Sequence, residues 1–142
     1  MSLSLTVLRK LESAAPAEAW SILFEQTWQT CSAGLAKGNA AAEVIKRDHS
    51  IGDLDLFLAT AGWDLWRCSE GAVEQTADVL SDWWRDRPPG RAVLILDALS
   101  IRETPWILQA AEERGYVVHQ ARPTGAELPA DTTPFAKALG FG

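Results

Sequence analysis

The chain has 142 residues, of which 47% are hydrophobic, and a formal net charge of −6. This length suffices for one compact domain with a buried core, or for one piece of a larger domain. Scattered Lys and Arg residues in an acidic chain do not provide the clustered positive charge of a general nucleic-acid or anionic-membrane surface. No apolar run approaches the roughly 20 residues of a membrane-spanning helix, and the N-terminus lacks a signal-peptide pattern, so we expect a cytoplasmic protein. Cys31 and Cys68 lie far apart without metal-ligand spacing, which predicts reduced, buried thiols.

The first ninety residues predict a helical region. Pro16 opens a segment whose apolar residues recur at three- and four-residue steps as far as Cys31. Similar patterns predict helices over about 40–46, 51–61 and 71–84, with a break at the polar run 47–50 and an end at the prolines near residue 88. Neighbouring helical residues point about 100 degrees apart. At least one of four closely spaced tryptophans should therefore be exposed: Trp63, Trp66, Trp83 or Trp84.

After Gly90 the pattern becomes that of a βαβ unit. Residues 92–96 are continuously apolar, which is typical of a strand buried on both faces of a parallel sheet. A helix is predicted from Thr104 to a glycine cap at Gly115, followed by a second strand over 116–121 and a last helix that begins at Thr133. The sequence therefore predicts an α/β fold, in which a helical N-terminal region over residues 1–90 precedes the start of a parallel sheet over residues 91–142.

Two residues of the predicted α/β region have the chemistry of a phosphoryl-transfer site. Asp97 follows the first predicted strand at its carboxyl end, where open α/β sheets bind their ligands, and its carboxylate can bind a metal ion. Thr132 precedes the predicted cap Thr133, so its hydroxyl would face the free amides of a helix N-terminus, where a phosphate can bind. Each has a structural alternative: Asp97 can accept backbone hydrogen bonds from the turn at 98–100, and both threonines can be ordinary capping residues.

Together these segments resemble a known family. Residues 93–99 (VLILDAL) look like the first strand of the alkaline phosphatase superfamily, in which a strand-ending Asp supplies a metal ligand. Residues 129–134 (PADTTP) are similar to the nucleophile loop of its phosphodiesterase branch. Over roughly residues 78–142 the chain resembles more closely the PglZ domain, a superfamily member found in BREX-type phage-defence systems and in some response regulators.

The resemblance implies a metal-dependent phosphatase or phosphodiesterase. Thr132 would be the nucleophile, Asp97 a metal ligand, and two divalent ions, usually zinc, the cofactors. The substrate would carry a phosphate, and other defence-system proteins would be partners. Arg102 would contact a phosphate oxygen or pair with Glu103, and Thr133 would contribute to substrate binding.

The family's further Asp and His ligands have no counterpart in this chain. His49, in a predicted polar turn, and His119, in a predicted strand, lack a ligand partner at productive spacing. Two interpretations remain open. In the first, the chain is the N-terminal part of a PglZ-type enzyme and is inactive by itself; an unpaired sheet edge and an apolar end at Phe141 favour this, and the edge would allow self-association. In the second, the chain is a small, non-catalytic α/β binding or interaction module.

Overall fold

The structure is a computed structural model that describes residues 4–34, 39–69, 71–85 and 89–141. The chain divides into two compact units. Unit 1 comprises Met1–Ala72 and Ser100–Pro123, and unit 2 comprises Val73–Leu99 and Thr124–Gly142. Each unit contains residues from both sides of the predicted boundary near residue 90, so the compact units differ from the predicted regions 1–90 and 91–142. The division into those two regions stays a prediction about domains.

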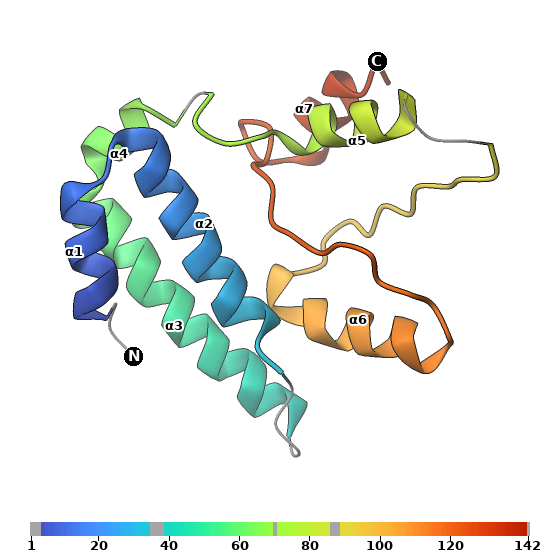
Figure 1. The fold of residues 1–142 in the computed structure, drawn as a ribbon, viewed down its shortest axis with the longest axis horizontal. Helices are drawn as coiled ribbons and strands as arrows, with labels where there is room; N and C mark the ends of the chain where they lie inside the picture. Colours follow the sequence, from blue (N-terminus) through green and yellow to red (C-terminus); the bar gives the residue numbers. More distant parts are fainter. Residues whose placement is uncertain (1–3, 35–38, 70, 86–88, 142) are drawn as a thin grey trace. The chain divides into compact units, whose positions relative to one another are not determined.

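Unit 1 is helical, and three of its helices lie side by side (Figure 1). Two further elements, which come from the later part of the chain, pack against the second of these three helices. In chain order the elements of unit 1 are α1 (Leu5–Ser13), α2 (Pro16–Ser32), α3 (Ala40–Ala61), α4 (Trp63–Arg67), the 3₁₀ helix η1 (Ile101–Glu103) and α6 (Thr104–Glu113).

The core of unit 1 forms around α2. Proline at its first position fixes a helical φ, which confirms the predicted start at Pro16. The Trp20 indole N–H donates to the Leu65 carbonyl at 2.9 Å, and the Trp20 ring packs edge-on against Trp66 with centroids 5.1 Å apart. These contacts fix α4 on α2. The buried apolar residues of this core are Ala19, Trp20, Leu23, Cys31 and Leu54.

A single helix, α3, runs through residues 47–50, where the sequence predicts a break. The break was predicted from polar residues, but Arg47 is a core residue with only 4% of its surface exposed. Its guanidinium donates to the carbonyls of Cys31 at 3.1 Å, Ala33 at 2.7 Å and Arg102 at 3.0 Å, and it lies 5.2 Å from the ring centroid of Trp106. The prediction of a break was wrong because these long-range partners make burial of the charge possible.

Unit 2 contains the helices α5 (Thr76–Arg85) and α7 (Thr132–Ala138), which contact each other. A loop from later in the chain holds the first turn of α5. The amide of Thr76 donates to the Gly125 carbonyl at 2.9 Å, and the amide of Ala77 donates to Glu127 Oε1 at 2.8 Å. Gly125 is required for this approach, since a Cβ there would lie 2.9 Å from the Val73 side chain. The loop that leads to Thr132 is thereby fixed on α5.

The prediction of an α/β fold with a parallel sheet was wrong. The described residues form an all-helical fold, and no β-strand occurs among them. The two segments predicted as strands, 92–96 and 116–121, are irregular and exposed; Leu94 is 81% and Val117 74% exposed. Apolar runs favour burial, but a strand exists only where a neighbouring backbone completes its hydrogen-bond ladder, and no such ladder forms in the described part of the chain.

Several local predictions can be checked against the structure. Gly115 has φ 81° and follows the end of α6, as the predicted glycine cap requires. Three of the four closely spaced tryptophans are exposed, namely Trp63, Trp66 and Trp84. The predicted stop at Pro88 lies outside the described residues, although α5 does end at Arg85. None of the described helices has the length and apolarity needed to cross a membrane.

The expected sheet edge is missing from the ranges that the structure describes, because the sheet itself is missing there. The route to self-association that the edge would have provided is therefore not found in this part of the chain. Self-association by another route stays a prediction. The two apolar segments nevertheless leave large side chains in contact with water, which is unusual for a compact soluble protein and makes these segments candidates for contact with a further surface.

Candidate functional site

The structure brings Asp97 and Thr132 together within unit 2. The Thr132 hydroxyl donates a hydrogen bond to Asp97 Oδ2 at 3.2 Å, across 35 positions of sequence. The other carboxylate oxygen, Oδ1, accepts from the amide of Ala98 at 2.8 Å. That second bond is the turn interaction expected of a purely structural Asp97. Both side chains are exposed, so a ligand from solvent can reach the pair.

The backbone adopts a left-handed conformation at the residue immediately after Asp97. Ala98 has φ 59°, in the left-handed region that costs a residue with a side chain roughly 1–2 kcal/mol. Non-glycine residues keep such a conformation only where the surrounding structure fixes it, and they concentrate at functional sites. Here the turn places the Ala98 N–H against the carboxylate, so the orientation of Asp97 is set by its own backbone.

The helix that carries Thr132 begins two residues earlier than predicted. Asp131 is the N-cap of α7, because its Oδ1 accepts from the amide of Thr133 at 2.8 Å, and Thr132 is the first helical residue. The predicted cap, Thr133, is exposed in the first turn. A carboxylate thus occupies this short helix terminus, so α7 offers little positive potential for the phosphate that the sequence led us to expect there.

Asp97 and Thr132 line a cavity of about 620 Å³ in unit 2. Much of its wall is apolar, with side chains from the segment before Asp97, from α7 and from the end of the chain. The charged side chains in the wall are the carboxylates of Asp97, Glu127 and Asp131. Because these charges are all negative, they repel a phosphate group unless a bound cation offsets them. The main apolar residues of the wall are Ile95, Leu96, Leu99, Phe135, Leu139 and Phe141.

Arg102, predicted to contact substrate, belongs to unit 1 and is engaged there. Its Nη2 pairs with Asp48 at 2.9 Å, and its Nη1 donates to Ser100 Oγ at 3.2 Å. Glu103 is not its partner, since Glu103 Oε2 accepts from the amide of Ser100 at 3.0 Å in a capping box. A role of Arg102 in phosphate binding stays a prediction, and its observed contacts are those of a residue that holds η1 and α3 together.

The described residues do not provide a complete set of metal ligands. His49 lies on α3 and His119 in irregular chain after α6, and both are exposed. Residues 4–34, 39–69, 71–85 and 89–141 contain no group of three or more His, Cys, Asp or Glu side chains that could hold a metal ion. These residues therefore do not form a two-metal centre by themselves.

The two cysteines have different environments. Cys31 is fully buried, as expected, and burial raises the pKa of its thiol, although the nearby Arg102 and Arg47 guanidinium groups oppose the rise. Cys68 is exposed, contrary to the expectation that both thiols are buried.

Sequence reasoning missed two residues of the cavity. Asp131 had a usable signal, because Asp is a strongly preferred N-cap and a proline follows three residues later. Glu127 had none, because the amide that it caps belongs to Ala77, 50 positions away.

No protein-family model, curated protein or solved structure matches the chain. The resemblance to the PglZ domain therefore rests on the motifs around Asp97 and Thr132 alone, and it stays a prediction.

Proposed function

We propose that this chain contributes the nucleophile and one metal-ligating carboxylate to a PglZ-type, metal-dependent phosphatase or phosphodiesterase. Thr132 is the nucleophile and Asp97 the ligand. The observation that carries the proposal is the hydrogen bond between Thr132 Oγ1 and Asp97 Oδ2. The two residues lie in separate sequence motifs, 35 positions apart. The resemblance further suggests a phosphate-bearing substrate and a phage-defence setting with other defence-system proteins as partners.

The proposed chemistry is a displacement at phosphorus. A threonine hydroxyl is a weak nucleophile and needs an adjacent proton acceptor or a metal ion. The Asp97 carboxylate already accepts the hydrogen bond of Thr132, which fixes the hydroxyl rotor and leaves the lone pairs of Oγ1 free for attack. As the bond from Oγ1 to phosphorus forms, the bond from phosphorus to the leaving oxygen breaks, and the hydroxyl proton passes through solvent to the leaving oxygen. Hydrolysis of the phosphorylated threonine then regenerates the hydroxyl.

The negative wall of the cavity supports a requirement for metal. Asp97, Glu127 and Asp131 all line the cavity, so a phosphate ester needs added positive charge to approach Thr132. Bound divalent ions, zinc by the resemblance, would supply that charge. Their remaining ligands must come from outside the described residues, since this part of the chain holds no group of three ligands. For that reason we do not expect the 142 residues by themselves to catalyse hydrolysis.

The test uses the protein as its own cells make it. The native protein is captured with an antibody against this chain and assayed with bis(p-nitrophenyl) phosphate and p-nitrophenyl phosphate, with zinc and after chelation. We expect metal-dependent hydrolysis that falls by at least about 10²-fold in Thr132→Ala, since a covalent nucleophile is lost. Thr6→Ala, an exposed substitution on α1, is the matched control and should leave the rate unchanged.

Either of two results would contradict the proposal: no metal-dependent hydrolysis by the captured protein, or hydrolysis that survives Thr132→Ala at the wild-type rate. The first result would favour the alternative of a non-catalytic interaction module. The exposed apolar side chains of Leu94 and Val117 give that alternative its physical basis.

A further inference from the structure

Unit 2 contains a second cavity, of about 670 Å³, that includes neither Asp97 nor Thr132. It lies along α5, is open to solvent, and is bordered by the apolar segment before Asp97 and by Leu139 and Phe141. Trp84 contributes an indole ring that is half exposed. The volume falls within the range of about 300–1,000 Å³ that small-molecule sites occupy. The main apolar residues of the wall are Leu80, Trp84, Val93, Ile95, Leu139 and Phe141.

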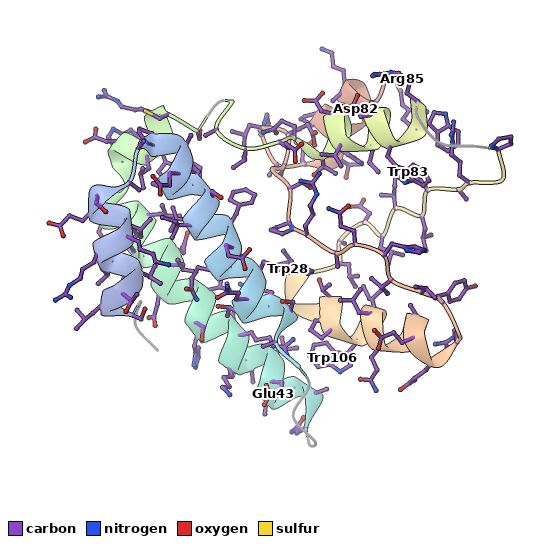
Figure 2. The ribbon with its side chains drawn as sticks, in the orientation of Figure 1. Trp28, Glu43, Asp82, Trp83, Arg85 and Trp106 are labelled. Atoms are coloured by element: carbon purple, nitrogen blue, oxygen red, sulfur yellow. The ribbon has the colours of Figure 1, made fainter. Side chains whose placement is uncertain are left out.

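The charged side chain in the wall of this cavity is basic, and a neighbouring carboxylate partly neutralises it. Arg85 is the charged member of the wall, and its Nη1 pairs with Asp82 Oδ1 at 2.9 Å. Figure 2 shows Asp82 and Arg85 on α5. Both side chains are about two-thirds exposed, and an exposed pair of this kind is weak, so an incoming anion can compete for the guanidinium. A second guanidinium, that of Arg91, lies 4.6 Å from the centroid of the Trp84 ring.

We propose that this cavity binds an amphipathic anion, namely an aliphatic chain that ends in a carboxylate. The chain would lie against Trp84 and the apolar wall, where burial of its methylene groups supplies the affinity. The carboxylate would be held by Arg85, whose planar guanidinium can donate two parallel hydrogen bonds to it. The charge selects the ligand class, because an apolar cavity alone accepts a neutral or cationic chain equally well. This inference is independent of the proposed hydrolase function.

The first experiment compares three probes that share the same chain and differ in the head group: decanoate, decanol and decyltrimethylammonium. Binding to the purified chain is measured by isothermal titration calorimetry below the micelle concentration of each probe. We expect saturable one-to-one binding of decanoate, at least about threefold tighter than that of the cation, because an ion pair with an exposed guanidinium changes affinity by up to about fivefold. Equal affinity for all three probes, or no saturable decanoate binding, would overturn the proposal.

Variants locate the site. Arg85→Gln should weaken decanoate binding about threefold and leave decanol binding unchanged, whereas Asp82→Asn should tighten decanoate binding by freeing the guanidinium. Arg9→Gln, an exposed substitution on α1, is the control and should change neither. Val93→Phe adds volume at a half-exposed wall position and should weaken decanoate and decanol together, with the far-ultraviolet circular dichroism preserved. Wild-type decanoate binding in Arg85→Gln or in Val93→Phe would place the ligand elsewhere and overturn the proposal.

Discussion

Replacement of Arg47 tests the packing of unit 1 directly. Its buried guanidinium connects three segments through the carbonyls of Cys31, Ala33 and Arg102, and it also contacts the Trp106 ring. Arg47→Met keeps most of the side-chain volume but removes every donor. Carbonyl groups that the guanidinium now satisfies would then lose their partner, with little access to water.

The expected loss can be bounded from these contacts. A hydrogen bond to a charged group contributes about 1.5–3 kcal/mol, but three bonds from one guanidinium are not additive. Arg47→Met leaves no buried charge but leaves carbonyl groups without a donor, and we expect it to lower the unfolding free energy of unit 1 by about 1–3 kcal/mol. Arg47→Lys keeps the charge and one donor group but loses the planar fork, so it should cost less than Arg47→Met.

The assay is urea unfolding followed by the NMR signal of the Trp20 indole N–H, which reports on unit 1 because it is bonded to the Leu65 carbonyl. Lys46→Met, one position earlier and exposed on α3, is the matched control and should change stability by no more than about 0.5 kcal/mol. A loss below about 1 kcal/mol in Arg47→Met, with an unchanged dependence on urea, would refute the view that this side chain holds the three segments together.

Four further predictions concern single sites. At pH 8 a thiol reagent should modify Cys68 rapidly and Cys31 only after unfolding, because burial shields Cys31 and raises the pKa of its thiol. Equal modification rates of the two cysteines in the folded protein would contradict this. Because the pKa of Cys31 is raised in the folded protein, its neutral thiol stabilises the fold at low and neutral pH, and this stabilisation should be lost as the pH rises through that raised pKa. Unfolding curves of the wild type and Cys31→Ala at alkaline pH measure the loss. Glu127→Ala removes the acceptor for the Ala77 amide and should lower the thermal stability of unit 2 by about 1 kcal/mol, whereas an unchanged melting curve would exclude a capping role. Mn²⁺ should broaden the amide NMR signals beside Asp97 more strongly in the wild type than in Asp97→Asn, where the Glu127 and Asp131 carboxylates remain, and equal broadening in both would remove Asp97 as a ligand.

The helices could be predicted from sequence because their signals are local. Pro16 and the apolar spacing that follows it mark α2 without any knowledge of the tertiary structure. The break expected at residues 47–50 failed for the opposite reason. Nothing near Arg47 in sequence indicates that its charge is satisfied by carbonyls at residues 31, 33 and 102, so a core arginine was interpreted as part of a polar turn.

The two predicted strands failed because strand formation is not a local property. Residues such as Leu94 and Val117 belong to apolar runs of the kind found in buried strands. What the sequence of one segment cannot show is whether another backbone lies beside it to complete the ladder. In the described chain none does, and these side chains are left exposed.

The candidate site could be predicted in part. Asp97 and Thr132 were chosen from their motifs, and their hydrogen bond links them as a shared site would require. Sequence rules could have predicted Asp131 as the N-cap, but the Thr-Pro pair at residues 133–134 led to the prediction of Thr133 instead. Glu127 could not be found, because its place in the cavity depends on how the loop packs on α5.

The central claim is that Thr132 attacks phosphorus, and trapping the covalent product tests it most directly. The captured native protein is mixed with zinc and p-nitrophenyl phosphate, quenched in acid during turnover, and digested for mass spectrometry of the peptide that contains residues 123–137. We predict a phosphoryl group on Thr132 in the wild type and its absence in Thr132→Ala. Demonstrated turnover with that peptide unmodified, or with the phosphoryl group on Thr133 instead, would contradict the assignment.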